Sequence, residues 1–227
     1  MRFSGFSHLI VQIANWIMKF SLINLLWVII NGPFAVITII MLSTGSFMEM
    51  LVPLTLLMIL TAFLLFPSTT ALFAITREWI MESEQSSLLK RYWALIRENY
   101  RTSFRAGSVY AFIWAVWFLD YQYLSSVNDL LGMILIIAGI LLFVNTVVFF
   151  CFHSHYRMPM KKLFSNSLLV TLGSPVMLLG TIVLGTSFVY FTARFPVVFI
   201  FFTGSVFAYL SFYLFFRYTL SVNRRTA

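Results

Sequence analysis

Few side chains in this chain could take part in chemistry, and those few are scattered. His153 and His155 flank Ser154, and Cys151 lies two residues before His153. An H-x-H pair is a poor metal site when no Cys, Asp or Glu stands near it in the sequence. Residues two apart on a helix do not face each other, so Cys151 and His153 are not a nucleophile–base pair. We expect no catalytic residues, no metal site, no bound cofactor and no enzyme activity.

Motifs for ATP chemistry are also missing from the sequence. No glycine-rich phosphate loop occurs, so the chain does not bind ATP in that way. No cytoplasmic loop has the E-A-A…G…P-like pattern by which common importer permeases hold their ATPase. We therefore expect neither an ATPase nor a permease of that type.

Three polar residues near or within apolar runs are the remaining candidates for a membrane path. Transporters place ionisable residues in the midst of membrane spans, or interrupt their helices with Gly and Pro. Asn31 precedes Gly32-Pro33 and marks a candidate kink, Asp120 is the acidic residue closest to a span interior, and Asn145 could bond a neighbouring helix. Helix packing, or a position at the outer interface for Asp120, is the alternative role for each.

The composition places the whole chain in a membrane. Of its 227 residues 61% are hydrophobic and only 10% are charged, whereas soluble domains average about 45–50% apolar and about 25% charged residues. The single cysteine excludes a disulfide framework. We expect one all-α, polytopic membrane domain over residues 1–227.

The long uncharged runs predict the individual spans. A bilayer core of about 30 Å takes about 20 helical residues. Six runs meet this length or come close to it, and the third is the shortest. The predicted spans are 22–44, 51–73, 106–124, 130–152, 168–191 and 196–217.

The N-terminal segment 3–19 has a different pattern. Apolar residues recur at helical spacing on one face, and His8, Gln12, Asn15 and Lys19 recur on the other. This pattern predicts an amphipathic helix that lies along the membrane surface. An irregular start to the first span is the alternative.

The basic residues predict the orientation. Lys and Arg accumulate on the cytoplasmic side of membrane proteins. With six spans and both termini inside, 14 of the 15 basic residues are cytoplasmic, and only Arg194 is outside, with Glu49, Asp120 and Asp129. We therefore expect a multi-pass membrane protein with both termini in the cytoplasm. The net charge of +8 is then a topology signal and does not indicate a nucleic-acid partner.

The largest predicted loop, 74–105, carries the charged stretch KRYWALIRENYRTSFR. Its apolar residues recur every three to four positions, with basic residues between them, which predicts a basic amphipathic helix. Its partner is either anionic lipid at the membrane surface or a cytoplasmic protein. The candidate docking residues are Lys90, Arg91, Trp93, Arg97, Glu98, Asn99, Tyr100, Arg101 and Arg105.

Four segments in order resemble one family. NLLWVIINGPF (24–34), PSTTALFAITREWI (67–80), RENYRTS (97–103) and LFSNSLLVTLGSPVMLLG (163–180) are similar to landmarks of the YesL-like bacterial membrane proteins. The resemblance covers about residues 15–216. This chain departs from the family pattern by about 30 residues between the first two segments, which is room for the span at 51–73.

The resemblance implies a role but no settled activity. YesL-like proteins are commonly encoded beside carbohydrate ABC-transporter permeases and sugar-binding lipoproteins. It implies an accessory subunit of an oligosaccharide importer, with permease subunits, the ATPase or the lipoprotein as partners beside the lipid bilayer. A small stand-alone carrier or channel, with a path near Asn31, Asp120 and Asn145, is the alternative. A homo-oligomer is compatible with either.

Overall fold

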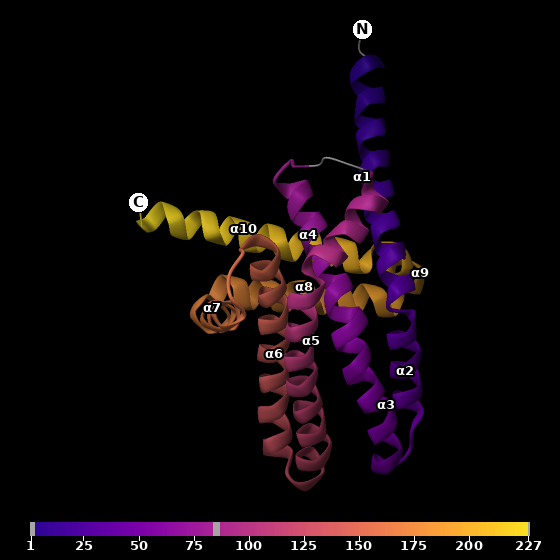
Figure 1. Ribbon diagram of the computed structural model, residues 1–227, viewed down its shortest axis with the longest axis vertical. Helices are drawn as coiled ribbons and strands as arrows, with labels where there is room; N and C mark the ends of the chain where they lie inside the picture. Colours follow the sequence, from indigo (N-terminus) through magenta and orange to yellow (C-terminus); the bar gives the residue numbers. More distant parts are fainter. Residues whose placement is uncertain (1–2, 84–86, 227) are drawn as a thin grey trace.

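The computed structural model describes residues 3–83 and 87–226, and no strand occurs among them. The chain runs through a series of helices that include two π-helical segments, η1 and η2 (Figure 1). Their bounds are α1 (Phe3–Ile30), α2 (Gly32–Ser43), α3 (Phe47–Leu60), η1 (Thr61–Leu65), α4 (Phe66–Ile80), α5 (Leu88–Val127), α6 (Asp129–His155), α7 (Met160–Gly173), α8 (Pro175–Arg194), α9 (Pro196–Val198), η2 (Phe199–Thr203) and α10 (Gly204–Thr226).

The first predicted span, 22–44, is two helices that meet at Asn31. Asn31 has φ −93° and ψ 7°, and Pro33 begins α2, where its missing N–H costs no helical hydrogen bond. The kink predicted at Asn31 is therefore present. By contrast, no break separates residues 3–19 from the first predicted span, because α1 continues to Ile30. The N-terminal half of α1 extends away from the other helices, and many of its apolar side chains are exposed (Figure 1).

The second predicted span, 51–73, lies inside one long helical stretch made of α3, η1 and α4. A π-helical turn carries an extra residue and occurs often at functional sites.

Helix α4 is central to the fold, since 12 of its 15 residues are buried. Its core neighbours include Tyr92, Tyr110, Phe149, Phe212 and Phe215.

The predicted cytoplasmic helix and the predicted third span, 106–124, form one helix of 40 residues, α5. We expected two elements, but no proline interrupts residues 88–127, and the single glycine, Gly107, does not break the helix. A Cβ at Gly107 would lie 2.8 Å from Phe66 Cβ and 3.0 Å from Ala62 Cα. Gly107 thus permits the close approach of α5 to η1 and α4.

The predicted fifth span, 168–191, is broken between α7 and α8. Pro175 begins α8, and Ser174 caps it by accepting a hydrogen bond from the Met177 N–H at 3.3 Å. A residue that precedes proline avoids helical geometry, which explains the break. Residues 175–191 of the predicted span therefore belong to α8, and residues 168–173 belong to α7.

The predicted fourth span, 130–152, lies within α6, and the sixth, 196–217, covers α9, η2 and part of α10. Within the described residues, five helices are long and apolar enough to cross a membrane: His8–Ile30, Phe47–Ile80, Asp129–His155, Pro175–Arg194 and Ile200–Val222. The region 106–124 is not among them. The protein thus has the helices of a multi-pass membrane protein.

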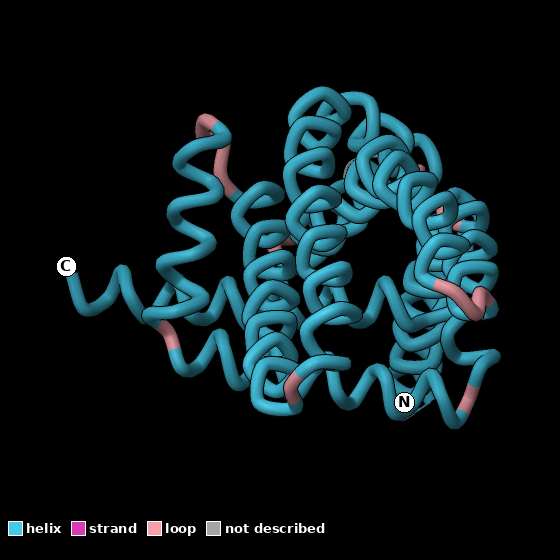
Figure 2. Tube along the Cα trace, turned by 90° about the horizontal axis from the view of Figure 1, so that it is seen from below, coloured by secondary structure: helices cyan, strands magenta, loops and turns pink. Residues whose placement is uncertain are grey.

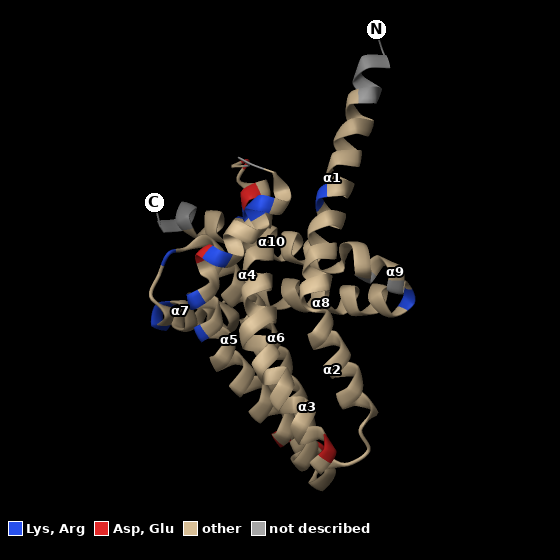
Figure 3. Ribbon diagram, turned by 45° about the vertical axis from the view of Figure 1, so that its right-hand side comes forward, with Lys and Arg blue, Asp and Glu red and all other residues tan. Residues whose placement is uncertain are grey.

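The helices lie in two directions. The hairpins α2–α3 and α5–α6 point the same way, and their connections lie at the same end of the molecule (Figure 1). Helices α8 and α10 pack on each other and run across these hairpins, as the view from below also shows (Figure 2). One membrane normal cannot be parallel to both sets of helices. Lys and Arg concentrate toward the end of the molecule opposite the hairpin connections, apart from those at the end of α8 (Figure 3).

Candidate functional site

Three polar or aromatic residues, two in α1 and one directly after it, join this helix to distant parts of the chain. The indole nitrogen of Trp27 donates to the Thr69 hydroxyl at 3.0 Å. The side-chain amide of Asn31 donates to the Ser68 hydroxyl at 2.8 Å and to the Trp27 carbonyl at 2.8 Å. These contacts connect the NLLWVIINGPF and PSTTALFAITREWI segments, and the bonded residues are 37 and 42 positions apart in the sequence.

Asn24 makes the third connection, to the second π-helical segment. Its side-chain amide donates to the Ile200 carbonyl at 2.8 Å, and its oxygen accepts from the Ser205 N–H at 2.9 Å. A π-helical turn leaves backbone groups without regular helical partners, and Asn24 satisfies one donor and one acceptor there. The start of α10 is thereby fixed against α1.

Tyr92 connects α5 to the same place on α4. Its hydroxyl donates to the Ser68 carbonyl at 3.0 Å, and the side chain is fully buried. Burial raises the pKa of Tyr92 above its ordinary value, so the phenol stays protonated. Tyr92 is one of the apolar residues of the predicted amphipathic helix, so part of the apolar side of that helix packs on α4.

Arg91 belongs to an ion-pair network and is less available for docking than predicted. Its guanidinium donates to Glu78 at 2.9 Å through Nε and to Glu98 at 3.1 Å through Nη1. The hydrogen bond to Glu78 raises the pKa of Arg91. Asn99 donates to the Leu95 carbonyl of its own helix at 3.0 Å. Arg91, Glu98 and Asn99 therefore have partners within the fold.

The other six candidate docking residues form an exposed face of α5, which we call the basic face. They are exposed, and the four cations among them form no ion pair within the described residues. Trp93 and Tyr100 also line a pocket of about 330 Å³ with residues of η1 and α4. The basic face consists of Lys90, Trp93, Arg97, Tyr100, Arg101 and Arg105.

The candidate path residues do not come together. Asn145 lies in a polar network in which it accepts from the Tyr110 hydroxyl at 2.7 Å and donates to Ser167 at 3.4 Å and to Thr171 at 3.5 Å. This network joins α5, α6 and α7. Asp120 is exposed near the α5–α6 connection.

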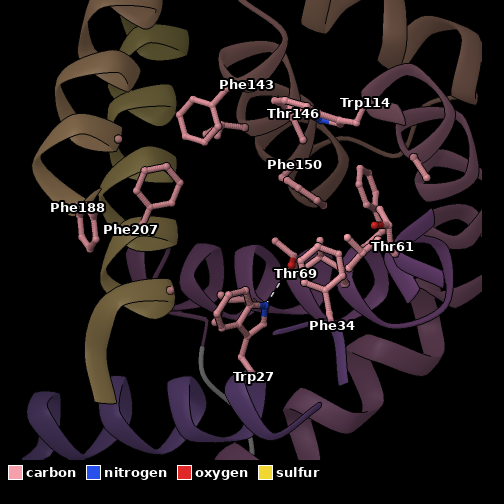
Figure 4. Close-up of a pocket in the computed structure, with 18 of the residues that line it drawn as sticks. Trp27, Phe34, Thr61, Thr69, Trp114, Phe143, Thr146, Phe150, Phe188 and Phe207 are labelled. Atoms are coloured by element: carbon pink, nitrogen blue, oxygen red, sulfur yellow. Dashed lines mark hydrogen bonds between the residues drawn. The ribbon is translucent and has the colours of Figure 1, made fainter. Parts of the chain in front are cut away.

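The described part of the chain encloses an apolar, partly open cavity of about 830 Å³. Its wall comes from α1, the two hairpins, η1, α4, α8 and the start of α10, and Figure 4 shows its aromatic side chains around the hollow. Asn31, Asp120 and Asn145 are not among its lining residues. Sequence analysis did not detect the cavity, although Trp27 and Thr69, which line it, lie in two of the family-like segments.

Comparisons with known proteins match the part of the chain that contains the central contacts. Residues 20–121 match the family model described as "Protein of unknown function, DUF624". The match includes Asn24, Trp27, Asn31, Ser68 and Tyr92 and ends within α5.

One curated relative is the uncharacterized protein YteU of Bacillus subtilis (strain 168). It is 27% identical over 110 residues, which cover 48% of this chain and 38% of the relative. No solved structure matches. These comparisons support similarity, over less than half of the chain, to a family of unknown function.

Proposed function

We propose that the protein is an accessory subunit of a bacterial carbohydrate ABC importer and acts by binding, without catalysis. It lies in the plasma membrane with both termini in the cytoplasm. The proposal starts from the resemblance to YesL-like proteins, whose genes commonly accompany those of such importers. The matching family model and the relative YteU are both described without a function, so they add no support to the proposed role.

The basic face of α5 is the observation that supports a docking role. The buried side of the same helix packs on α4 through Tyr92 and Leu95. Tyr100 of the basic face donates a hydrogen bond to the Phe63 carbonyl at 3.4 Å, whereas the four cations of this face form no ion pair within the described residues and so are available to a partner. Aromatic residues and Arg are enriched at protein interfaces, and this face presents both. Its positive charge would suit an acidic surface on a permease or ATPase subunit.

A pull-down from native membranes in mild detergent tests the proposal. We expect permease subunits and a sugar-binding lipoprotein to elute with the tagged protein. Arg97→Glu combined with Arg101→Glu should reduce their recovery by about tenfold, equivalent to about 1.4 kcal/mol of binding free energy. Lys161→Glu with Lys162→Glu, two exposed residues of α7, is the control with the same change in net charge. A homo-oligomer without importer subunits would contradict the proposal.

The alternative is a stand-alone carrier, and the large cavity favours it. Its wall contains no charged side chain among the described residues, so it suits an apolar solute better than an oligosaccharide. Reconstitution of the pure protein in liposomes separates the two functions. Flux of a labelled apolar solute above that of protein-free liposomes, without any partner, would favour the carrier. Absence of such flux together with importer subunits in the pull-down would favour the accessory role.

A further inference from the structure

The cavity between the two hairpins is built as an apolar site. Its few polar lining groups are threonine hydroxyls and tryptophan nitrogens. The three tryptophan nitrogens are bonded inside the protein: Trp27 to Thr69 at 3.0 Å, Trp114 to Thr146 at 3.3 Å, and Trp117 to the Leu135 carbonyl at 2.8 Å. The wall therefore offers an occupant mainly hydrocarbon and aromatic surface.

Water is a poor occupant of this space. A buried water molecule needs two to four polar partners. Thr146 donates to the Leu142 carbonyl at 2.7 Å, and Thr203 donates to the Val198 carbonyl at 3.3 Å. Since these two hydroxyl protons are used within the helices, the other lining threonines, Thr61, Thr69 and Thr192, offer about 830 Å³ of cavity only three side-chain hydroxyls, too few to fill it with ordered water.

Glycines help to keep the space open. The Phe143 ring lies over Gly185, where a Cβ would come within 2.8 Å of the ring. The Trp117 ring lies over Gly139, where a Cβ would come within 2.4 Å. These two large rings of the wall rest on the surfaces of neighbouring helices and leave the hollow between them unfilled, as Figure 4 shows for Phe143.

The membrane around the protein contains molecules that fit this cavity. The cavity is partly open, and all five of the described helices able to cross a membrane contribute to its wall. Lipid chains are the most abundant apolar molecules beside such helices. A volume of about 830 Å³ lies within the range of about 300–1,000 Å³ typical of ligand sites.

We propose that this cavity binds a hydrocarbon chain of a membrane lipid. The hydrocarbon chain would lie between the α2–α3 and α5–α6 hairpins, against the rings of Trp27, Phe143 and Phe207. This site is separate from the basic face and does not depend on importer association.

Photo-crosslinking tests the proposal directly. The full-length protein is reconstituted in vesicles of phosphatidylethanolamine and phosphatidylglycerol, with a trace of phosphatidylglycerol that carries a diazirine in the middle of one acyl chain. Mass spectrometry then locates the labelled residues. We expect label on the wall residues Phe143, Thr146 and Phe207, in addition to the outward residues Phe112 and Ile113.

Filling the cavity gives the second arm of the test. Ala111→Phe places a ring in the cavity from α5. Because this ring takes space that the lipid chain would occupy, the affinity for the lipid chain should fall by about tenfold, and labelling of the wall should fall with it. Val109→Phe, two residues away on the exposed side of the same helix, should leave it unchanged. Thr192→Phe fills the cavity from α8 and replaces Ala111→Phe if that variant does not fold.

Either of two results would overturn the inference. One is labelling of the outward residues of the unmodified protein with no label on the wall. The other is wall labelling that persists at the same level in a folded cavity-filling variant.

Discussion

The Trp27 indole and the Thr69 hydroxyl, 3.0 Å apart, join α1 to α4 at the wall of the cavity. One turn further along the chain, Asn31 binds Ser68, the residue before Thr69. Ser68 also accepts a hydrogen bond from Tyr92 through its carbonyl. Three helices thus meet at two adjacent residues of α4, and the kink at Asn31 is held in place by this junction.

Trp27→Phe tests the strength of the junction. The variant keeps a ring in the cavity wall but loses the N–H that Thr69 accepts, so we expect a loss of about 1 kcal/mol in the free energy of unfolding. Unfolding in mixed detergent micelles measures it. Trp93→Phe is the matched control, because Trp93 is 47% exposed, and it should change the stability by less than about 0.5 kcal/mol. Equal effects for both variants would contradict a structural role for the Trp27 bond.

Gly107→Ala tests the contact of α5 with η1 and α4. Alanine favours a helix over glycine by about 1 kcal/mol, yet its Cβ would overlap Phe66 Cβ at 2.8 Å. We expect a net destabilisation of about 1–3 kcal/mol, which thermal unfolding in detergent would detect.

Gly173→Ala is the control for that substitution. No atom lies within 4 Å of a Cβ at Gly173. The alanine there should be neutral or stabilising. If Gly107→Ala were as stable as Gly173→Ala, the close approach of α5 to η1 would be wrong.

Glu82→Gly should stabilise the protein. Glu82 has φ 52° at the end of α4, where its N–H donates to the Trp79 carbonyl and the following Ser83 N–H donates to the Glu78 carbonyl at 3.0 Å. Glycine adopts this left-handed conformation without the cost of about 1 kcal/mol that other residues incur. We expect a rise in the unfolding temperature, whereas Glu49→Gly, a residue in the first turn of α3, should lower it.

The elements that the sequence predicted well are those with strong local signals. Gly32-Pro33 after Asn31 indicated the kink, and the uncharged run 130–152 indicated a helix that forms part of α6. The break at Ser174-Pro175 was equally visible, but hydropathy averaged over a span hides a backbone constraint at one residue. The continuity of α5 was missed because a change from charged to apolar sequence is not a change in backbone conformation.

The candidate site was harder to predict because its contacts depend on tertiary structure. The spacing of Leu88, Tyr92 and Ile96 reveals an apolar face but not whether lipid or α4 covers it. Likewise, Arg91 resembles its exposed neighbours in sequence, and only its position beside Glu78 separates it from them. The cavity wall combines residues of eight α-helices, so no local pattern could have indicated it.

Cysteine labelling tests the orientation and the crosswise helices together. In a Cys151→Ala background, which removes the only native cysteine, single cysteines replace exposed residues. Glu49→Cys and Asp129→Cys lie in the first turns of α3 and α6, next to the hairpin connections, whereas Lys90→Cys lies in the first turn of α5 at the opposite end. If both termini are cytoplasmic, a membrane-impermeant maleimide added to intact spheroplasts should label positions 49 and 129, and it should label position 90 only after permeabilisation. The reverse pattern would contradict the orientation. Arg194→Cys tests separately where the end of α8 lies. Labelling of position 194 from outside would indicate that this end reaches the outer surface, as predicted from the sequence.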